Sequence, residues 1–144
     1  MTLHAPYDRD NIFAKMLRGE IPAIKVFEDD VALAFMDIFP QAPGHTLVIP
    51  KDVEARNLLE MPADKLGAYM ERVQKVAVAV EKALSPDGLV ITQFNGAPAG
   101  QTVFHLHFHI IPRAVNVALS EHAGGQAADT EELKQMAEKI KSAL

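Results

Sequence analysis

One long amphipathic segment constrains the fold more than any other feature of the sequence. After Pro62, apolar residues recur at steps of three and four as far as Leu84, and Ser85-Pro86-Asp87-Gly88 then ends the pattern. This spacing predicts a helix over 63–84 with a single apolar face. The apolar positions are Leu66, Met70, Val73, Ala77, Val80 and Leu84.

Short apolar runs separated by turn residues lie on both sides of this helix. Residues 24–28 and 31–36 predict a hairpin, and 46–50 predicts a third strand rich in β-branched residues. Residues 89–94 and 104–111 predict two more strands, with Gly and Pro in the segment between them. These short connections around one long helix indicate an antiparallel α+β domain, because a doubly wound sheet needs more helices between its strands.

Two shorter helices are expected near the ends of the chain. Asp10 is placed to cap the first helix, which ends at Gly19. Asp129 and Glu132 form a capping-box pattern at the start of a last helix that runs to about Ser142.

Length and composition fit one globular domain. The chain has 144 residues, of which 49% are hydrophobic and 23% charged, enough to bury a substantial core without a stabilising metal or disulfide. We expect a flexible leader over 1–9, one domain over 10–113, and a C-terminal loop and helix over 114–144. Within the last part, the Ala- and Gly-rich stretch 123–128 is expected to be an exposed loop.

Charge and cysteine content exclude several functions. A net charge of −5 argues against a protein that coats nucleic acid or binds a membrane through a polybasic surface. The absence of cysteine excludes a disulfide framework, a thiolate zinc site, an iron–sulfur cluster and a cysteine nucleophile. The sequence has no apolar run of membrane-spanning length and no signal-peptide pattern, so we expect a cytoplasmic protein.

Three of the six histidines alternate with apolar residues, at His105, His107 and His109. Alternate residues of a β-strand share a face, so the three imidazoles are expected on one side of the 104–111 strand. The residues of the other side are expected to pack against the long helix; they are Phe104, Leu106, Phe108 and Ile110.

The residues alone leave three interpretations of the histidines open. The first is an ordinary solvated strand face, although such faces usually carry Thr, Lys, Glu or Ser. The second is a metal site completed by Asp30, Asp37 or His45, although the outer two backbone positions on a strand lie about 13 Å apart, too far for all three rings to share one ion easily. The third is catalysis on an anion, because neighbouring imidazoles that titrate near neutral pH can divide nucleophilic and acidic roles. A phosphoryl centre suits this third interpretation, since catalysis there is mainly positioning and charge stabilisation.

Several motifs, in the same order along the chain, resemble those of the histidine triad nucleotide-binding family. The resemblance implies a five-stranded antiparallel sheet in each subunit and a homodimer in which the two sheets join, with the 66–84 helix at the subunit interface. The motifs that carry it are Asn11-Ile12-Phe13, Leu33-Ala34-Phe35-Met36-Asp37, Pro43-Gly44-His45, Ala99-Gly100-Gln101-Thr102 and the run from His105 to Ile111.

The same resemblance implies an activity. The reaction would be hydrolysis or transfer at the α-phosphate of a purine nucleotide, without a metal or other cofactor, and with an AMP-type product. His107 would form a nucleotidyl–imidazole intermediate, while His105, His109 and His45 would bind phosphate oxygens and hold the tautomer of His107. Purine nucleoside 5′-phosphoramidates or other adenylated compounds are the expected substrates; dinucleoside polyphosphate hydrolysis, or nucleotide binding with incidental hydrolysis, are the alternatives.

A nucleotide pocket is also implied by the resemblance. Asp37 would hold the ribose hydroxyls, whose two donors suit a carboxylate. The residues expected around the base are Ile12, Phe13, Met16, Ile21 and Phe35, and those expected beside the phosphate and leaving group are Asn95, Gly100, Gln101 and Thr102. Without the resemblance, the apolar members of this set would be assigned to the core.

The sequence departs from the family pattern at one point. Many bacterial relatives of this kind carry Cys-x-x-Cys in the first helix and bind a structural zinc, whereas this chain has Asn11 and Ala14 there and Val53 in place of an expected His. The resemblance therefore implies that the zinc site has been lost. Residues 97–102 resemble the branch that hydrolyses dinucleoside polyphosphates, and the N-terminal half resembles the phosphoramidate branch.

Overall fold

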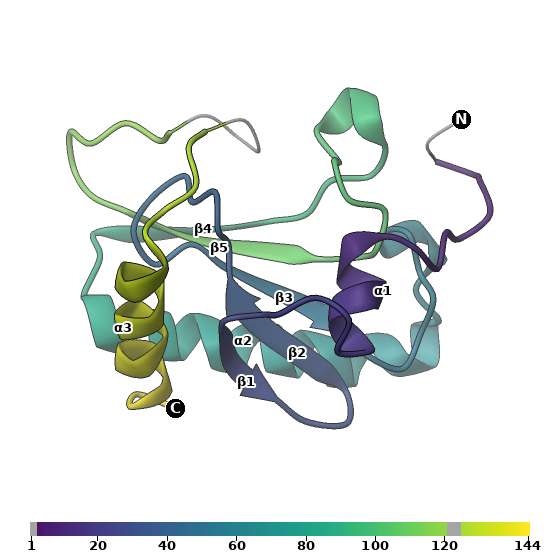
Figure 1. Ribbon diagram of the computed structural model, residues 1–144, viewed down its shortest axis with the longest axis horizontal. Helices are drawn as coiled ribbons and strands as arrows, with labels where there is room; N and C mark the ends of the chain where they lie inside the picture. The colour runs from purple at the N-terminus through teal and green to yellow at the C-terminus, as the bar shows by residue number, and fades with distance from the viewer. Residues whose placement is uncertain (1–2, 121–124) are drawn as a thin grey trace.

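A five-stranded antiparallel sheet forms the centre of the molecule, which the computed structural model describes over residues 3–120 and 125–144 (Figure 1). The spatial order of the strands is β1-β2-β3-β5-β4, so β1 and β4 are its edges. The α+β class and the antiparallel sheet are confirmed. The strands are β1 (Lys25–Glu28), β2 (Ala32–Met36), β3 (Thr46–Pro50), β4 (Gly88–Thr92) and β5 (Phe108–Arg113).

Different helices cover the two faces of the sheet (Figure 1). Because side chains alternate along a strand, β2 contributes to both sides. Ala32, Ala34 and Met36 pack in the core beneath the long helix α2 (Ala63–Leu84), while Leu33 and Phe35 pack on the side of the short helix α1 (Ile12–Leu17). The sheet therefore separates a large α2-side core from a small α1-side core.

Helix α2 has the bounds that the sequence predicts. Ser85 ends it in the left-handed conformation, with φ at 47°. The buried phenol of Tyr69 donates a hydrogen bond of 2.8 Å to the backbone oxygen of Val48, which joins the middle of the helix to β3. No helix within 3–120 and 125–144 has both the length and the hydropathy needed to cross a membrane.

The last helix, α3 (Thr130–Lys141), also agrees with prediction. The carboxylate of Asp129 accepts from the backbone N–H of Glu132, as a capping box requires. Leu133, Ala137 and Ile140 join the α2-side core. Of the expected exposed loop over 123–128, residues 123 and 124 lie outside the described ranges, while 126 and 127 are exposed.

The predicted cap of the first helix was wrong by one residue. Asn11, rather than Asp10, is the N-cap, since its side-chain oxygen accepts from the Ala14 N–H at 2.9 Å. The start of the helix is otherwise as expected, and Gly19 follows its end with φ at +78°.

The last predicted strand starts four residues later than expected, at Phe108 instead of Phe104. The reason is a competing hydrogen bond: the Leu106 N–H donates to the oxygen of Ala55, which lies outside the sheet. The prediction that Phe104 packs against α2 is also wrong, because Phe104 is not part of the α2-side core. The Arg56 guanidinium lies over its ring instead, 4.8 Å from the centroid. Leu106, Phe108 and Ile110 do pack on the α2 side as predicted.

Gly44 is a position where only glycine fits. Its φ is +92°, and an added Cβ would overlap the Leu84 side chain and lie 3.1 Å from Cγ of Pro112. We expect Gly44→Ala to lower the free energy of unfolding by about 2 kcal/mol, from backbone strain and steric overlap together.

The matched control is Gly67→Ala in α2, where an added Cβ meets nothing within 4 Å. This change should raise the free energy of unfolding by about 0.5–1 kcal/mol, because alanine favours the helix. Urea denaturation of both variants tests the pair. A Gly44→Ala protein as stable as the parent would contradict the predicted strain and steric overlap at position 44.

Candidate active site

The three histidines of the alternating run lie on the α1 side of the sheet. Only His109 belongs to β5, yet His105 and His107 keep the alternation and are buried with it. The ring of Phe13 meets His107 edge-on at a centroid distance of 5.0 Å, and His107 lies 4.9 Å from His109. The expected shared face therefore exists, although a strand forms only part of it.

His105 is a neutral ring held from both sides. Its Nε2 lies 3.0 Å from the Pro50 oxygen, which can only accept, so Nε2 carries the proton. Its Nδ1 accepts from the Tyr7 hydroxyl at 2.5 Å. Burial lowers the pKa of His105 to about 4, so the ring is uncharged at neutral pH.

The proton of His107 is placed by the backbone. Nδ1 of His107 lies 2.7 Å from the backbone oxygen of His105. A carbonyl oxygen cannot donate, so the Nδ1 of His107 must carry the proton. In a neutral ring, the lone pair is then on Nε2, which is the state that a nucleophilic imidazole needs.

A second pair of histidines forms a directional chain. The Gln41 backbone N–H donates to Nδ1 of His45 at 3.0 Å, so a neutral His45 carries its proton on Nε2. That Nε2 lies 2.9 Å from Nδ1 of His109. His109 accepts this hydrogen bond, and its own proton is then on Nε2, where it is suited to an anionic oxygen.

The loop from Asp37 to His45 carries this chain. Its two ends are joined by a hydrogen bond of 3.0 Å from the Asp37 N–H to the His45 oxygen. One carboxylate oxygen of Asp37 accepts from the Phe39 N–H at 2.8 Å, and the other lies 3.5 Å from Nε2 of His45. Asp37 thus both shapes the turn and faces the histidine pair with negative charge.

Asp37, His45 and His109 are also arranged closely enough to suggest a metal site. Their candidate ligand atoms all lie within 4.8 Å of one another. A metal-binding His usually donates its second ring N–H to an acceptor, whereas Nδ1 of His45 faces the N–H donor of Gln41. These hydrogen bonds fit a proton-bearing Nε2 better than a metal-bound one, and Asp30 is no member of this group.

The expected base-pocket residues divide into two groups. Phe13 and Phe35 are buried in the α1-side core and meet edge-on at 5.3 Å, and Met16 packs against that core. Ile21 is half-buried, while Ile12 is 50% exposed. The first group thus belongs to the core on which the His107 ring also packs, whereas Ile12 is exposed and Ile21 half-buried.

The loop before the histidines is held by its own amide side chains. The side-chain oxygen of Gln101 accepts from the Gly96 N–H at 2.8 Å, and its amide nitrogen donates to the oxygens of Arg56 and Val103. The side-chain oxygen of Asn95 accepts from the Leu58 N–H at 3.2 Å. These two side chains, expected beside a phosphate, are thus used in shaping the loop.

Gly100 and Thr102 have different positions in the same loop. Gly100 has φ at +113°, and an added Cβ would lie 3.4 Å from the ring of Phe94. Phe94 in turn meets His109 edge-on at 5.4 Å. Thr102 is exposed, so its hydroxyl is a group of this loop that solvent can reach.

Tyr7 and Gln41 contact the site histidines but were not among the predicted residues. Tyr7 lies in the segment 1–9, where no pattern marked it. Gln41 acts on His45 through its backbone N–H, which every residue except proline has, so its side chain gave no signal.

Comparisons with known proteins agree on one family. The HIT domain model matches residues 18–116. A crystal structure of a Hit-like protein from Bartonella henselae superposes with a TM-score of 0.88 and 52% identity, covering 96% of this chain and all of that one. The adenosine 5′-monophosphoramidase of Schizosaccharomyces pombe is 37% identical over 92% of this chain and 97% of its own length. An adenylylsulfatase of Arabidopsis thaliana is 41% identical over 72% of this chain and 52% of its own.

The low pKa of His105 predicts a specific acid sensitivity. The unfolded chain binds a proton on this ring near pH 6.5 and the folded chain only near 4, so acid favours unfolding. The contribution of the neutral His105 ring to the free energy of unfolding is complete above pH 6.5. It is lost as the pH falls towards 4, by up to about 3 kcal/mol. Urea denaturation at several pH values between 4 and 7 measures the slope of the free energy of unfolding against pH.

His105→Gln removes the titrating ring and should make that slope shallower. His4→Gln is the control, because His4 is exposed and should leave the slope unchanged. Equal slopes in His105→Gln and the parent would contradict the prediction.

Proposed function

We propose that this chain, which belongs to the histidine triad (HIT) family, hydrolyses purine nucleoside 5′-phosphoramidates or related adenylated compounds at the α-phosphorus. The observation that carries the proposal is the hydrogen bond from Nδ1 of His107 to the His105 oxygen, which leaves Nε2 as the nucleophilic atom of a neutral ring. The names of two relatives, a monophosphoramidase and an adenylylsulfatase, support nucleotide hydrolysis as the reaction class.

In the proposed first step, Nε2 of His107 attacks the α-phosphorus in line with the leaving group. The bond from phosphorus to nitrogen breaks, and the departing amine takes a proton from water. The imidazole becomes positively charged, and its Nδ1–H keeps donating to the His105 oxygen, which favours this charge. The Nε2–H of His109 is proposed to donate to a phosphate oxygen and so stabilise the transition state.

In the second step, water attacks the same phosphorus, the bond to His107 breaks, and one proton of the water returns to solvent. The product is the nucleoside monophosphate, and Nε2 regains its lone pair. The neutral His105 takes no proton in this scheme; it orients the peptide oxygen that holds His107. This course needs no metal ion, in line with the hydrogen bonds around His45.

The proposed nucleotide pocket combines side chains of and after α1 with the loop from Asp37 to His45 and the loop from Asn95 to Thr102. Asp37 would accept from the ribose hydroxyls, and the base would lie against Ile12, Met16 and Ile21, with Phe13 and Phe35 behind them. Thr102 and the backbone at Gly100 would face the phosphate or the leaving group. In this scheme Asn95 and Gln101 act through the loop that they hold.

The experiment that tests the proposal is a search for the covalent intermediate. We expect mass spectrometry during turnover of adenosine 5′-phosphoramidate, without acid quenching, to find an adenylyl group on His107. His107→Ala should abolish the adduct and lower turnover by a factor on the order of 10³ or more, because the nucleophile is lost.

His4→Ala is the matched control and should keep both the adduct and the turnover. Normal turnover in His107→Ala would refute the mechanism. Turnover of diadenosine polyphosphate in preference to the phosphoramidate would assign the chain to the alternative substrate class. Tight nucleotide binding with negligible turnover of either substrate would favour a binding protein.

We also propose that the chain forms a homodimer through α2 and β4. Strand β4 is an edge of the sheet, and its Ile91 is 47% exposed. On the adjoining face of α2, Val78 is 42% exposed, and a shallow groove lies between helix and strand. An edge strand beside an exposed apolar face is suited to pairing with a second copy.

Ile91→Lys is expected to convert the dimer to a monomer, because it places a charge in the apolar contact. Analytical ultracentrifugation measures the mass. Leu59→Lys is the control, since Leu59 is an exposed apolar residue outside this groove. A parent protein that sediments as a monomer at micromolar concentration would refute the proposed dimer.

A further inference from the structure

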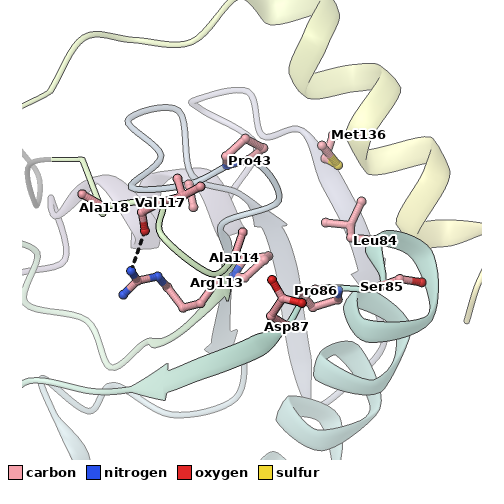
Figure 2. A pocket seen from close by; sticks show the side chains of 12 residues that line it. Pro43, Leu84, Ser85, Pro86, Asp87, Arg113, Ala114, Val117, Ala118 and Met136 are labelled. Atoms are coloured by element: carbon pink, nitrogen blue, oxygen red, sulfur yellow. Dashed lines mark hydrogen bonds between the residues drawn. The ribbon is translucent and has the colours of Figure 1, made fainter.

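The segment that follows β5 is attached to the rest of the molecule at its start. We call residues 114–120 the C-terminal arm. The Arg113 guanidinium donates to the Val117 oxygen at 2.8 Å, as the dashed line in Figure 2 shows. The Val115 N–H donates to the carboxylate of Asp87 at 2.8 Å, which joins the arm to the start of β4. The path of the arm is therefore set at its root by two charge-assisted hydrogen bonds.

At its other end the arm is attached to the loop from Asp37 to His45. The Ser120 N–H donates to the backbone oxygen of Gln41 at 2.8 Å, and the side-chain amide of Gln41 donates back to the Ser120 oxygen at 3.2 Å. The Ala128 N–H adds a third bond of 2.9 Å to the Ile38 oxygen. The C-terminal part of the chain thus holds the loop at two of its residues.

A cavity of about 320 Å³ is bordered by the arm, the loop, the end of α2 with the turn after it, and Met136 of α3 (Figure 2). Ala42 and Pro43 line it from the loop, and Val117 and Ala118 line it from the arm. Dense packing of side chains therefore does not fill this space. The reciprocal pair of hydrogen bonds between Ser120 and Gln41 links the arm to the loop.

Gln41 is the residue whose backbone N–H sets the tautomer of His45. Its N–H and its C=O flank the same Cα, so a bond that fixes the carbonyl also limits the direction of the N–H. Pro40 and Pro43 lie on either side and have no N–H with which to hold the loop. The contact with Ser120 is thus well placed to keep the Gln41 N–H on His45.

We propose that the C-terminal arm positions the active site, with Ser120 holding Gln41 so that the Gln41 N–H fixes the tautomers of His45 and His109. This inference rests on the proposed function for its kinetic consequence. Gln41 is a positioning residue in this scheme, because it acts on the site through His45.

The chemical consequence follows from the direction of the hydrogen bonds. With the Gln41 N–H in place, His45 donates from Nε2, and His109 keeps its proton on Nε2 to donate to a phosphate oxygen. If that N–H turns away, His45 can carry its proton on Nδ1, and its Nε2 then accepts. His109 would in turn donate from Nδ1 and present a lone pair on Nε2, which repels an anionic oxygen.

The test compares two substitutions at one position. Ser120→Pro removes the N–H that reaches the Gln41 oxygen, whereas Ser120→Ala keeps it and changes only the side chain. Nitrogen-15 NMR of the imidazoles identifies which ring nitrogens are protonated, independently of any activity. We expect the parent and Ser120→Ala to show His45 protonated on Nε2, and Ser120→Pro to show a mixture of tautomers.

In kinetics with adenosine 5′-phosphoramidate, Ser120→Pro should lower kcat by a factor on the order of 10 to 100, because the donor on His109 is misplaced. KM should change little, since the base and ribose contacts remain. Ser120→Ala should match the parent in both constants.

A second variant keeps the test decisive if Ser120→Pro does not fold. Gln41→Met has similar length and removes one of the two bonds, the amide that donates to the Ser120 oxygen, so it should shift the His45 tautomer and lower kcat in the same direction but less than Ser120→Pro. Unchanged His45 nitrogen shifts in the folded variants would overturn the proposal, as would an equal loss of kcat in Ser120→Ala. If the parent does not turn over the substrate, the proposed function fails, and the tautomer measurement alone then decides the role of the arm.

Discussion

The proton positions of the site depend on the direction of three backbone hydrogen bonds. The Pro50 and His105 carbonyls can only accept, so they place protons on Nε2 of His105 and Nδ1 of His107. The Gln41 N–H can only donate, so it leaves the proton of His45 on Nε2. In their neutral forms the four imidazoles could adopt many combinations of tautomers, and these groups select one. A nucleophilic Nε2 on His107 and a donating Nε2 on His109 follow from that selection.

The sheet allows the site and the main core to be built from the same strands. Along the run that ends in β5, Leu106, Phe108 and Ile110 pack beneath α2 while the histidines face α1. Burial of the apolar residues thus fixes the register, and a shift by one residue would exchange the two sets. Packing of these residues in the α2-side core therefore also fixes the positions of the histidines between them.

Features that arise from local patterns were predictable from the sequence. The apolar period gave the bounds of α2, and the alternation from 104 to 111 gave the correct face for Leu106 and for all three histidines. Errors arose where a distant group competes with a local one. The Ala55 oxygen accepts from the Leu106 N–H, which would otherwise have extended β5, and the Arg56 guanidinium lies over the ring of Phe104. Asp10 and Asn11 are both good caps, and sequence alone could not choose between them.

The hydrogen-bond partners of the Asn95 and Gln101 side chains could not be predicted from the sequence either. The family resemblance places Gln101 and Asn95 beside the phosphate, whereas their hydrogen bonds in the structure hold the loop in shape. Which partner a buried amide finds depends on chain segments far away in sequence, such as Arg56 and Leu58. Spacing along the chain carries no information about such partners.

The two histidine pairs are completed by residues outside the part of the chain that the family model matches. That match covers residues 18–116, whereas the Tyr7 hydroxyl holds His105 and Ser120 holds the residue that orients His45. Tyr7 supplies a neutral donor to a ring whose pKa burial has already lowered, so it stabilises the uncharged form. Residues inside the matched region also orient the histidines, such as Gln41 and Pro50, so orientation comes from both parts of the chain. Tyr7 and Ser120 therefore add contacts from outside the matched region to the backbone hydrogen bonds within it.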